Sequence, residues 1–311
     1  MGNVIIKEII FNIKALLKKC YTYIVVLLCS RHVIKEDFMY YVDYHMHSSH
    51  SPDCGEPPEN QILSAISKGI DEICFTDHIE LGFSDWNYRE MDIDRYMNDI
   101  REFQEKYKQI KIKIGAEIGI SCSDRDLDRT MEIVNSHSFD FVIASAHRID
   151  NINVFNSSFY EDDRFQDFCK KYIVVLLQSI EKTSGLVYNS IGHIDLPIKP
   201  ACRIIPDFPY KEFKYEYAAS EIDELLKYII SHGKCLEINT ASWLLPNGAV
   251  PECKWLKRYA ELGGQYVTIG SDAHMKQAVG NNFDKAVDLA RSSGIKYLAV
   301  YNKMEPEFIS L

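Results

Sequence analysis

From residue 40 onward, the sequence alternates short apolar runs rich in β-branched and aromatic residues with segments of helical periodicity. Such alternation is typical of β/α units, in which parallel strands pair and helices cover the sheet. Strands are expected at residues 42–45, 72–76, 110–117, 139–145, 187–193, 234–239 and 266–271. Helices are expected at residues 59–68, 93–107, 127–136, 163–182, 217–231, 252–262 and 283–292, with a possible closing strand at 297–300. The pattern therefore predicts an α/β fold built from repeats of strand and helix.

Residues able to bind metal ions follow nearly every one of these predicted strands. The set comprises His45, His47, Asp53, His78, Glu117, His147, His193, Asp272 and His274. The repeats can form an open sheet or a closed barrel, but only a closed ring brings the ends of the first and last strands to one point. No linker rich in Pro, Gly or Ser divides the repeats. We therefore predict a single barrel domain with its functional site at the carboxyl ends of the strands.

Two pairs in this set have the spacing of a shared metal site. Side chains two apart on an extended strand point to the same side, so His45 and His47 can bind one ion, and so can Asp272 and His274. Any single histidine of the set could instead be a hydrogen-bonded core residue. Burying the whole set of ionisable groups together would be costly without cations. Mixed imidazole and carboxylate ligands without clustered thiolates favour zinc, manganese or iron.

The composition limits the partners and the compartment. A formal net charge of -10 argues against a nucleic-acid surface built from basic contacts. The 9 cysteines are an odd number in a long chain without a C-x-x-C pair, which favours a reducing cytoplasm over a disulfide framework. Cys74 and Cys235 lie within predicted strands and are expected to be small core residues.

Residues 1–38 differ from the rest of the chain. Several lysines precede an apolar stretch at residues 21–29. This stretch is shorter than the roughly 20 residues that a membrane-spanning helix needs, so no membrane partner is expected. No small-residue cleavage site follows it. Residues 1–38 are therefore expected to be either a misassigned start, with translation beginning at Met39, or a real amphipathic or membrane-associating extension. Residues 39–311 are expected to form the barrel domain.

Short motifs surround the expected metal ligands. They are His45-x-His47, Thr76-Asp77-His78, Gly115-Ala116-Glu117, Ser145-Ala146-His147, Gly192-His193-Ile194-Asp195, Leu236-Glu237-Ile238-Asn239-Thr240 and Ser271-Asp272-Ala273-His274. Over roughly residues 40–280, these motifs resemble those of the PHP (polymerase and histidinol phosphatase) family, especially its monofunctional histidinol-phosphatases. The resemblance implies a distorted seven-stranded β/α barrel of the TIM type that holds three divalent metal ions.

The resemblance also implies how the ligands divide among the three ions. The sets would be His45, His47, Glu117 and Asp272; Glu117, as a bridge, with His147 and His193; and Asp53, His78 and His274. Asp53 departs from those family members that place a histidine there, while others carry aspartate. This departure could change the affinity or the identity of the third metal.

The expected chemistry is hydrolysis of a phosphomonoester by a metal-bound hydroxide, so no protein nucleophile is required. The sequence agrees, because it lacks the cysteine-phosphatase loop, the P-loop motif and the H-E-x-x-H helix motif. Arg148 is the best candidate for a phosphate contact, although it could equally be a surface charge. Asp77 could be a general acid or could orient a metal ligand, and Asp195 could also orient one. Glu237 and Asn239 share a strand face and could contact substrate.

From the resemblance, we expect hydrolysis of L-histidinol phosphate to L-histidinol and phosphate, a step of histidine biosynthesis. The related alternative is a PHP phosphoesterase that acts on another small phosphate or on phosphotyrosine. A metal-dependent amidohydrolase also begins with His-x-His and ends with a late aspartate, but it needs no third set of ligands. A barrel kept only for binding should have lost ligands, and none of the expected set is missing here.

Overall fold

A closed ring of parallel strands forms the centre of the molecule in the computed structural model. The described residues are 39–82, 89–160, 165–183, 185–205, 214–244 and 253–311. In ring order the strands are β1 (Val42–Asp43), β2 (Glu72–Phe75), β4 (Lys111–Gly119), β5 (Phe141–Ser145), β8 (Ser190–Ile191), β9 (Cys235–Asn239) and β10 (Tyr266–Gly270). Each predicted strand is confirmed. The expectations for residues 1–38 lie outside the described residues.

Backbone hydrogen bonds between β10 and β1 close the ring. The Tyr44 N–H donates to the Ile269 carbonyl at 3.0 Å, and the His47 N–H donates to the Ala273 carbonyl at 2.9 Å. Because the residues after β1 hydrogen-bond to β10 and to the residues that follow it, the sheet is a barrel rather than an open, doubly wound sheet. The fold is therefore a distorted (β/α)7 barrel of the TIM type, as expected.

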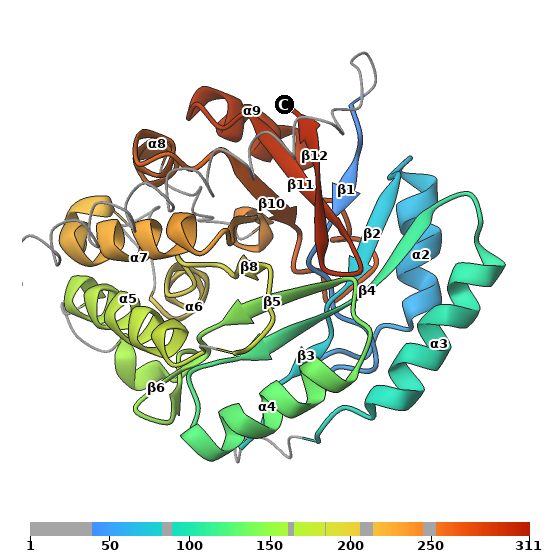
Figure 1. Cartoon of the computed structure of the whole chain (residues 1–311), viewed down its shortest axis with the longest axis horizontal. Coiled ribbons are helices and arrows are strands. Elements are labelled where there is room, and N and C mark those ends of the chain that lie inside the picture. Colours follow the sequence, from blue (N-terminus) through green and yellow to red (C-terminus); the bar gives the residue numbers. More distant parts are fainter. Residues whose placement is uncertain (1–38, 83–88, 161–164, 184, 206–213, 245–252) are drawn as a thin grey trace, which may run out of the picture.

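Helices surround the ring (Figure 1). They are α2 (Pro58–Ser67), α3 (Ile93–Lys106), α4 (Asp124–Ser136), α5 (Phe165–Glu181), α7 (Ala219–Ser231), α8 (Cys253–Glu261) and α9 (Phe283–Ser292). Each predicted helix is present, with ends that differ by a few residues. Side-chain caps help to fix where two of these helices begin. Asp92, the N-cap residue of α3, accepts a hydrogen bond from the Arg95 N–H, and Ser123, the N-cap residue of α4, accepts one from the Asp126 N–H. The short helix α6 (Ile198–Ile204) has no counterpart among the predicted elements.

The predicted strand at 297–300 is present as β11 (Tyr297–Asn302), but it does not close the ring. It pairs with the start of β10 and then, antiparallel, with β12 (Glu305–Ser310). The tip of this hairpin reaches the amino ends of other ring strands: the Met304 N–H donates to the Asp140 carbonyl at 2.8 Å, and the Asn189 side chain donates to the Met304 carbonyl at 2.9 Å. The hairpin therefore covers the amino end of the barrel, as Figure 1 shows.

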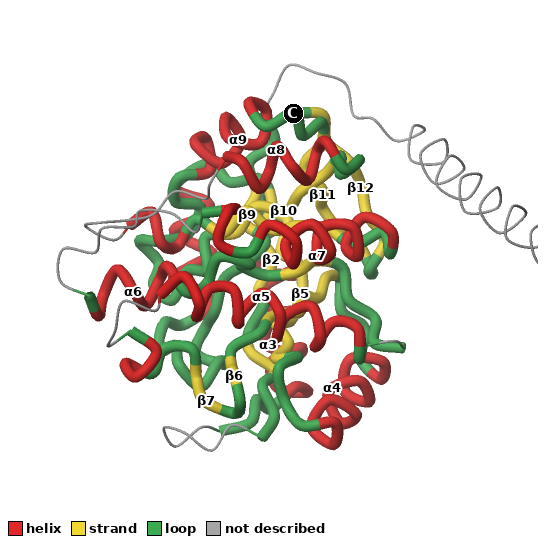
Figure 2. Tube along the Cα trace, turned by 90° about the vertical axis from the view of Figure 1, so that its left-hand side faces the viewer, coloured by secondary structure: helices red, strands yellow, loops and turns green. Residues whose placement is uncertain are grey.

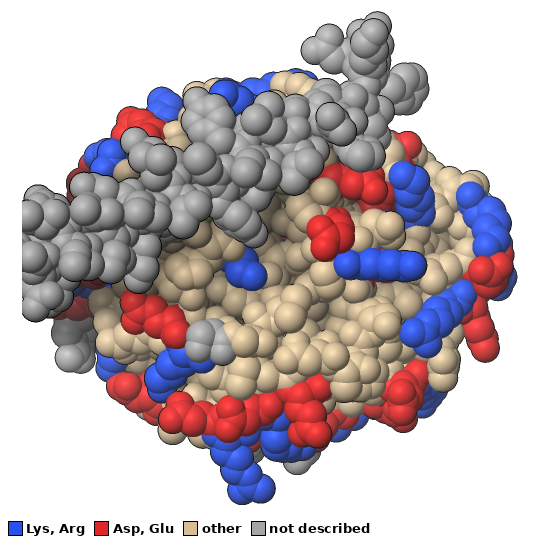
Figure 3. Space-filling model, in the orientation of Figure 1, with Lys and Arg blue, Asp and Glu red and all other residues tan. Residues whose placement is uncertain are grey.

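The strands lie inside the layer of helices (Figure 2). Buried apolar residues of the strands belong to the hydrophobic core. Tyr301 of the hairpin packs against Phe141, with ring centroids 4.8 Å apart. Cys74 and Cys235 are fully buried in strands, as predicted, and neither forms a disulfide bond. On the face that the hairpin crosses, charged side chains gather around the rim and the middle is mostly uncharged (Figure 3). Within the described ranges, no helix has the length and apolar character needed to cross a membrane.

Candidate metal centre

The predicted metal ligands all converge at the carboxyl end of the barrel. His45 and His47 follow β1, Glu117 lies near the end of β4, and His78 begins the short strand β3 (His78–Ile79), which pairs with β4 so that His78 faces Glu117. The others follow further ring strands or lie in the loop after β1: Asp53, His147, His193, Asp272 and His274. A ring of parallel strands brings these distant residues to one place, as the strand-end pattern predicts.

Glu117 is the centre of the cluster and is only 1% exposed. Its two carboxylate oxygens face imidazoles on both sides. Oε2 lies 3.0 Å from His78 Nδ1, 3.3 Å from His45 Nε2 and 3.4 Å from His47 Nε2. Oε1 lies 2.9 Å from His193 Nε2 and 3.3 Å from His147 Nε2. The carboxylate is therefore placed to bridge two groups of donors.

Three buried polar atoms of the cluster have no hydrogen-bond partner among the described residues. They are Glu117 Oε2, His78 Nδ1 and His193 Nδ1. A buried polar atom without a partner costs roughly 1–3 kcal/mol, and native proteins contain few of them. Glu117 Oε2 lies among imidazole nitrogens that could each coordinate a cation. The arrangement fits a divalent metal bound between them.

Glu117 Oε2 and three nearby donors have several pairwise distances close to those within a metal coordination sphere. His45 Nε2 and His47 Nε2 are 3.1 Å apart, and each lies 3.3–3.4 Å from Glu117 Oε2. Asp272 Oδ1 is 3.3 Å from His47 Nε2 and 3.9 Å from His45 Nε2. In a tetrahedral zinc site with ligand distances of about 2.0–2.1 Å, neighbouring donors are about 3.3 Å apart. These residues could therefore hold one ion with little movement.

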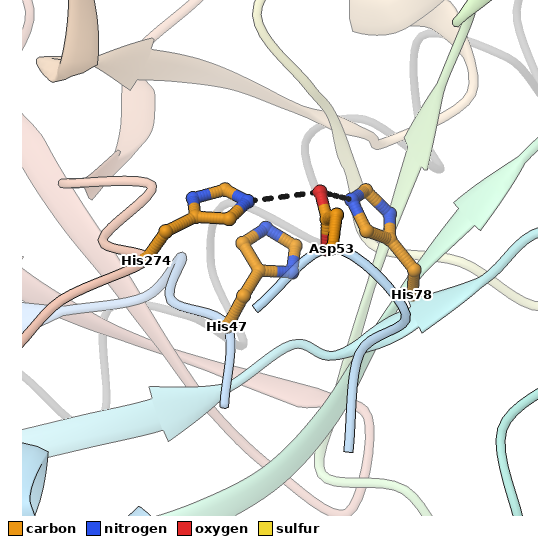
Figure 4. Close-up of side chains that lie close together, drawn as sticks. All are labelled: His47, Asp53, His78 and His274. Carbon is orange, nitrogen blue, oxygen red and sulfur yellow. Dashed lines mark hydrogen bonds and ion pairs between the residues drawn. The ribbon is translucent and has the colours of Figure 1, made fainter. Parts of the chain in front are cut away.

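Asp53 organises the outer side of the cluster. Figure 4 shows its carboxylate between two imidazoles, with Oδ2 3.0 Å from His274 Nε2 and 3.4 Å from His78 Nε2. The ring of His47 stacks on that of His78 at a centroid distance of 4.3 Å. The Asp53 side chain is 43% exposed. This part of the cluster is therefore more open to solvent than Glu117.

The donors form four overlapping groups, within each of which the ligand atoms lie within 4.8 Å of one another. The groups are His47, Asp53, His78 and His274; His45, His47 and Glu117; His45, His193 and Asp272; and His78, Glu117 and His147. Together they contain every predicted ligand. Imidazole and carboxylate donors of this kind suit zinc, manganese and iron.

The cluster shifts the pKa values of its histidines in opposite directions. Burial disfavours both imidazolium ions, but the negative charges of Glu117 and Glu80 outweigh it at His147 and raise its pKa to about 10. For His47, burial and the neighbouring His78 and His274 lower the pKa to about 3. A metal-bound imidazole must be neutral, so a cation bound by His147 would displace a proton from it.

The structure gives Arg148 and Asp77 contacts that hold the site together. Arg148 is buried, not a surface charge; it donates to Glu80 Oε1 at 3.0 Å and to the carbonyls of Leu81 and Gly82 at 2.7 and 3.0 Å. Asp77 is fully buried and accepts from the Ser48 N–H at 2.7 Å, which fixes the loop after β1. Burial raises the pKa of Asp77.

Two carboxylates contact predicted histidine ligands on the side away from Glu117. Glu80, which the sequence did not single out, has Oε2 2.8 Å from His147 Nδ1. Glu237 shares its strand face with Asn239 as predicted, but its Oε1 lies 2.5 Å from His45 Nδ1, so it contacts a ligand. The sequence did contain a signal for Glu80, which lies two residues after His78 in an extended segment. Alternate residues of such a segment share a face, so Glu80 could have been expected on the same side as His78.

A small pocket, partly open to solvent, adjoins the cluster. Its lining includes the predicted ligands His193 and Asp272 and, around them, Asp195, Leu196, Lys199, Asn239 and Ser242. The Lys199 ammonium lies 2.6 Å from Asp272 Oδ2. Lys199, which sequence reasoning missed, comes from the unpredicted helix α6. The cavity thus combines metal-type ligands, a cation and neutral polar groups.

Comparisons with known proteins agree with this site. The family model of the PHP domain matches residues 43–241. The histidinol-phosphatase of Lactococcus lactis is 31% identical over 268 residues, covering 85% of this chain and 95% of the relative. The probable histidinol-phosphatase of Clostridium acetobutylicum is 28% identical, covering 82% of this chain and 94% of the relative.

A solved structure supports the same relationship. It is the histidinol phosphate phosphatase of Lactococcus lactis, complexed with zinc, L-histidinol and phosphate. The two folds match with a TM-score of 0.76 at 31% sequence identity, covering 86% of this chain and 98% of the other. With the family model spanning most of the barrel and this likeness extending over nearly the whole of both chains, the protein belongs to the PHP domain family.

Proposed function

We propose that this protein is a metal-dependent phosphomonoesterase that hydrolyses L-histidinol phosphate to L-histidinol and phosphate. The observation that carries the proposal is the convergence of every predicted metal ligand beside a cavity with a cation, in a fold shared with a zinc-containing histidinol phosphate phosphatase. The substrate identity comes from the relatives, whereas the reaction class also follows from the donor set.

We assign three divalent cations, zinc, manganese or iron, to the ligand sets that the family resemblance implies. The distances around Glu117 Oε2 support the first set, which includes His45, His47 and Asp272. Glu117 Oε1 lies near His147 and His193, which supports the second set and the bridging role of Glu117. The contacts of Asp53 with His78 and His274 support the third set.

Bound cations would supply an activated water and would neutralise charge on the phosphoryl oxygens. The residues of the chain position the reactants. Lys199 holds Asp272 and faces the cavity, where its ammonium can bind a phosphoryl oxygen. Asn239 and Ser242 offer neutral polar groups to the alcohol portion of the substrate. Arg148 acts through Glu80 on the orientation of His147, and Asp77 keeps the loop after β1 in place.

We also assign residues 39–311 to the catalytic domain and place its activity in the cytoplasm. Two features support the assignment. The ring, the covering hairpin and the metal-type ligands all lie in this range. Cys54, Cys74, Cys122, Cys169 and Cys235 are free thiols, which suits a reducing compartment.

The test is phosphate release from L-histidinol phosphate by protein purified without chelator, with metal content measured on the same sample. p-Nitrophenyl phosphate and a phosphotyrosine peptide serve as comparison substrates. We expect turnover of L-histidinol phosphate that greatly exceeds both and that is lost with chelator. Bound metal with turnover of only the generic ester or the peptide would overturn the substrate, and absence of both metal and turnover would overturn the enzyme.

Two variants separate chemistry from folding in this assay. Glu117→Gln removes a carboxylate that contacts donors on both sides of the cluster, so turnover should be abolished. Glu72→Gln changes a carboxylate that is also buried, but it lies on the first residue of β2 and contacts Tyr40 and Tyr44 rather than metal-type ligands. Turnover should survive this second change.

A further inference from the structure

Two buried carboxylates contact the outer nitrogens of histidines on opposite sides of Glu117. His45 directs Nε2 to Glu117 at 3.3 Å and Nδ1 to Glu237 at 2.5 Å. His147 repeats the arrangement, with Nε2 3.3 Å from Glu117 and Nδ1 2.8 Å from Glu80. In both cases the inner nitrogen faces the cluster and the outer nitrogen faces a carboxylate that belongs to no predicted ligand set.

The second oxygen of each carboxylate is also anchored. Glu237 Oε2 accepts the backbone N–H of His193 at 2.7 Å, so one carboxylate on β9 contacts ligand segments from β1 and β8. Glu80 Oε1 accepts from the Arg148 guanidinium at 3.0 Å. Glu80 and Glu237 are 3% and 6% exposed, respectively. Because both oxygens are held and solvent is nearly excluded, neither carboxylate is free to turn away from its histidine.

Glycines at the ends of two strands provide the space for these carboxylates. Gly119 is the last residue of β4, and a Cβ atom there would lie 2.0 Å from Glu80 Oε2. Gly270 is the last residue of β10, and a Cβ atom there would lie 2.8 Å from Glu237 Oε1 and 2.2 Å from His45 Cβ. Any side chain at either position would displace the carboxylate or its histidine.

We propose that Glu237 and Glu80 are positioning residues that fix the tautomer and the ring orientation of His45 and His147. A carboxylate that accepts from Nδ1–H leaves the lone pair on Nε2, which is the atom that faces Glu117 in both histidines. The two histidines are then prepared to bind cations on either side of Glu117. This inference rests on the proposed metal ligation but not on the identity of the substrate.

The test compares Glu237→Gln and Glu80→Gln with the parent protein. Each carboxylate accepts hydrogen bonds on both oxygens, so an amide would turn its NH2 group toward a donor on one side. We expect Zn²⁺ affinity, measured by competition with a chromophoric chelator, to fall by about 10–100-fold. We also expect NMR signals of the Zn²⁺-loaded protein to show that the Nδ1–H of one imidazole has lost its hydrogen bond to a carboxylate in each variant.

Glu72→Gln is the matched control, because Glu72 is a buried carboxylate bonded to the hydroxyl of Tyr40 on a different part of the barrel. Its Zn²⁺ affinity should remain within about twofold of the parent. If both positioning variants bind Zn²⁺ as tightly as this control and keep their imidazole signals, the proposal is wrong. Should a glutamine variant not fold, Glu237→Asp and Glu80→Asp provide the same comparison, since the shortened carboxylate should also weaken binding and parent-like affinity would overturn the proposal.

The measurement is made without substrate, so its result is independent of the proposed reaction. Weaker Zn²⁺ binding in the variants would support the positioning role even if the parent failed to hydrolyse L-histidinol phosphate. A parent that binds no Zn²⁺ would overturn the metal ligation and this inference with it. A parent that turns over substrate while the variants keep full affinity would overturn the inference alone.

Discussion

Replacing Gly270 by alanine tests how tightly the first and last strands of the ring are packed at the level of the ligands. The new Cβ would lie 2.2 Å from His45 Cβ and 3.1 Å from the His45 backbone nitrogen. Carbon atoms in ordinary contact lie about 3.5–4.0 Å apart, so the Cβ atoms must separate by about 1.3 Å or more. His45 cannot relieve the clash by changing rotamer, because its backbone nitrogen and Cβ are both too close.

The expected loss follows from this geometry. Adding a methyl group to a packed interior costs about 1–3 kcal/mol. For a domain of this size, that corresponds to a fall in unfolding temperature of about 2–12 °C. Because His45 Nε2 faces Glu117, its displacement should also weaken Zn²⁺ binding, by about tenfold for each 1.4 kcal/mol transferred to the site. Calorimetric or circular-dichroism melts with and without chelator measure the first effect, and chelator competition measures the second.

Gly55→Ala is the control for the effect of adding a methyl group as such. No atom lies within 4 Å of a Cβ at Gly55, and its φ angle is not in the left-handed region. The free energy of unfolding should therefore change by less than about 0.5 kcal/mol. If Gly270→Ala melts at the same temperature as Gly55→Ala and binds Zn²⁺ equally well, the packing argument is refuted.

Other charged contacts lead to further expected results. The raised pKa of His147, about 10, means that its imidazole is protonated at pH 7 in metal-free protein. Zn²⁺ binding should therefore release a proton, and the affinity should increase as the pH rises toward 10. Calorimetric titrations in two buffers of different ionisation enthalpy measure this release, and finding none would contradict the prediction. Lys199→Gln removes the ammonium beside Asp272. If this ammonium binds the phosphate of the substrate, kcat/KM should fall by about 10–100-fold, because a charge-assisted hydrogen bond contributes about 1.5–3 kcal/mol. A change below twofold would exclude the contact between Lys199 and phosphate. In the Arg148→Lys variant, the lysine ammonium cannot reach Glu80 and both loop carbonyls together. The unfolding temperature should therefore fall while KM stays near that of the parent. A raised KM would instead support the predicted contact between Arg148 and phosphate.

The positions of the metal-type ligands could be predicted because they depend on local order. His45, Glu117 and His193 each lie at or directly after an apolar run, and in a parallel barrel all such ends meet. The spacing of two residues between His45 and His47 also indicated a shared side correctly, since their Nε2 atoms are 3.1 Å apart. Periodicity and strand ends were sufficient for this part of the site.

The depth of a side chain within the barrel could not be predicted in the same way. Glu237 and Asn239 share a face, but whether the glutamate reaches substrate or a ligand depends on the stagger between β9, β1 and β8, and alternation along one strand does not encode stagger. Lys199 was missed because α6 is a short helix flanked and interrupted by Pro197 and Pro200, with too few residues to show a helical period. The partner of β11 was equally hidden, because an apolar run has the same pattern whether it completes a ring or forms a hairpin.

The seam between β1 and β10 joins the first strand of the ring to the last. Asp43 and Ser271, which hydrogen-bond across it, are 228 residues apart in the sequence. His45 and His47 lie on one side of this seam, and Asp272 and His274 lie on the other. A cation held from both sides would cross-link the ring over a very long loop and would bind only the closed form, so its free energy of binding would add to that of folding. The proposed metal would then fasten the first strand to the last, as a disulfide does in a secreted domain, and a chain that ends before β10 could not retain it.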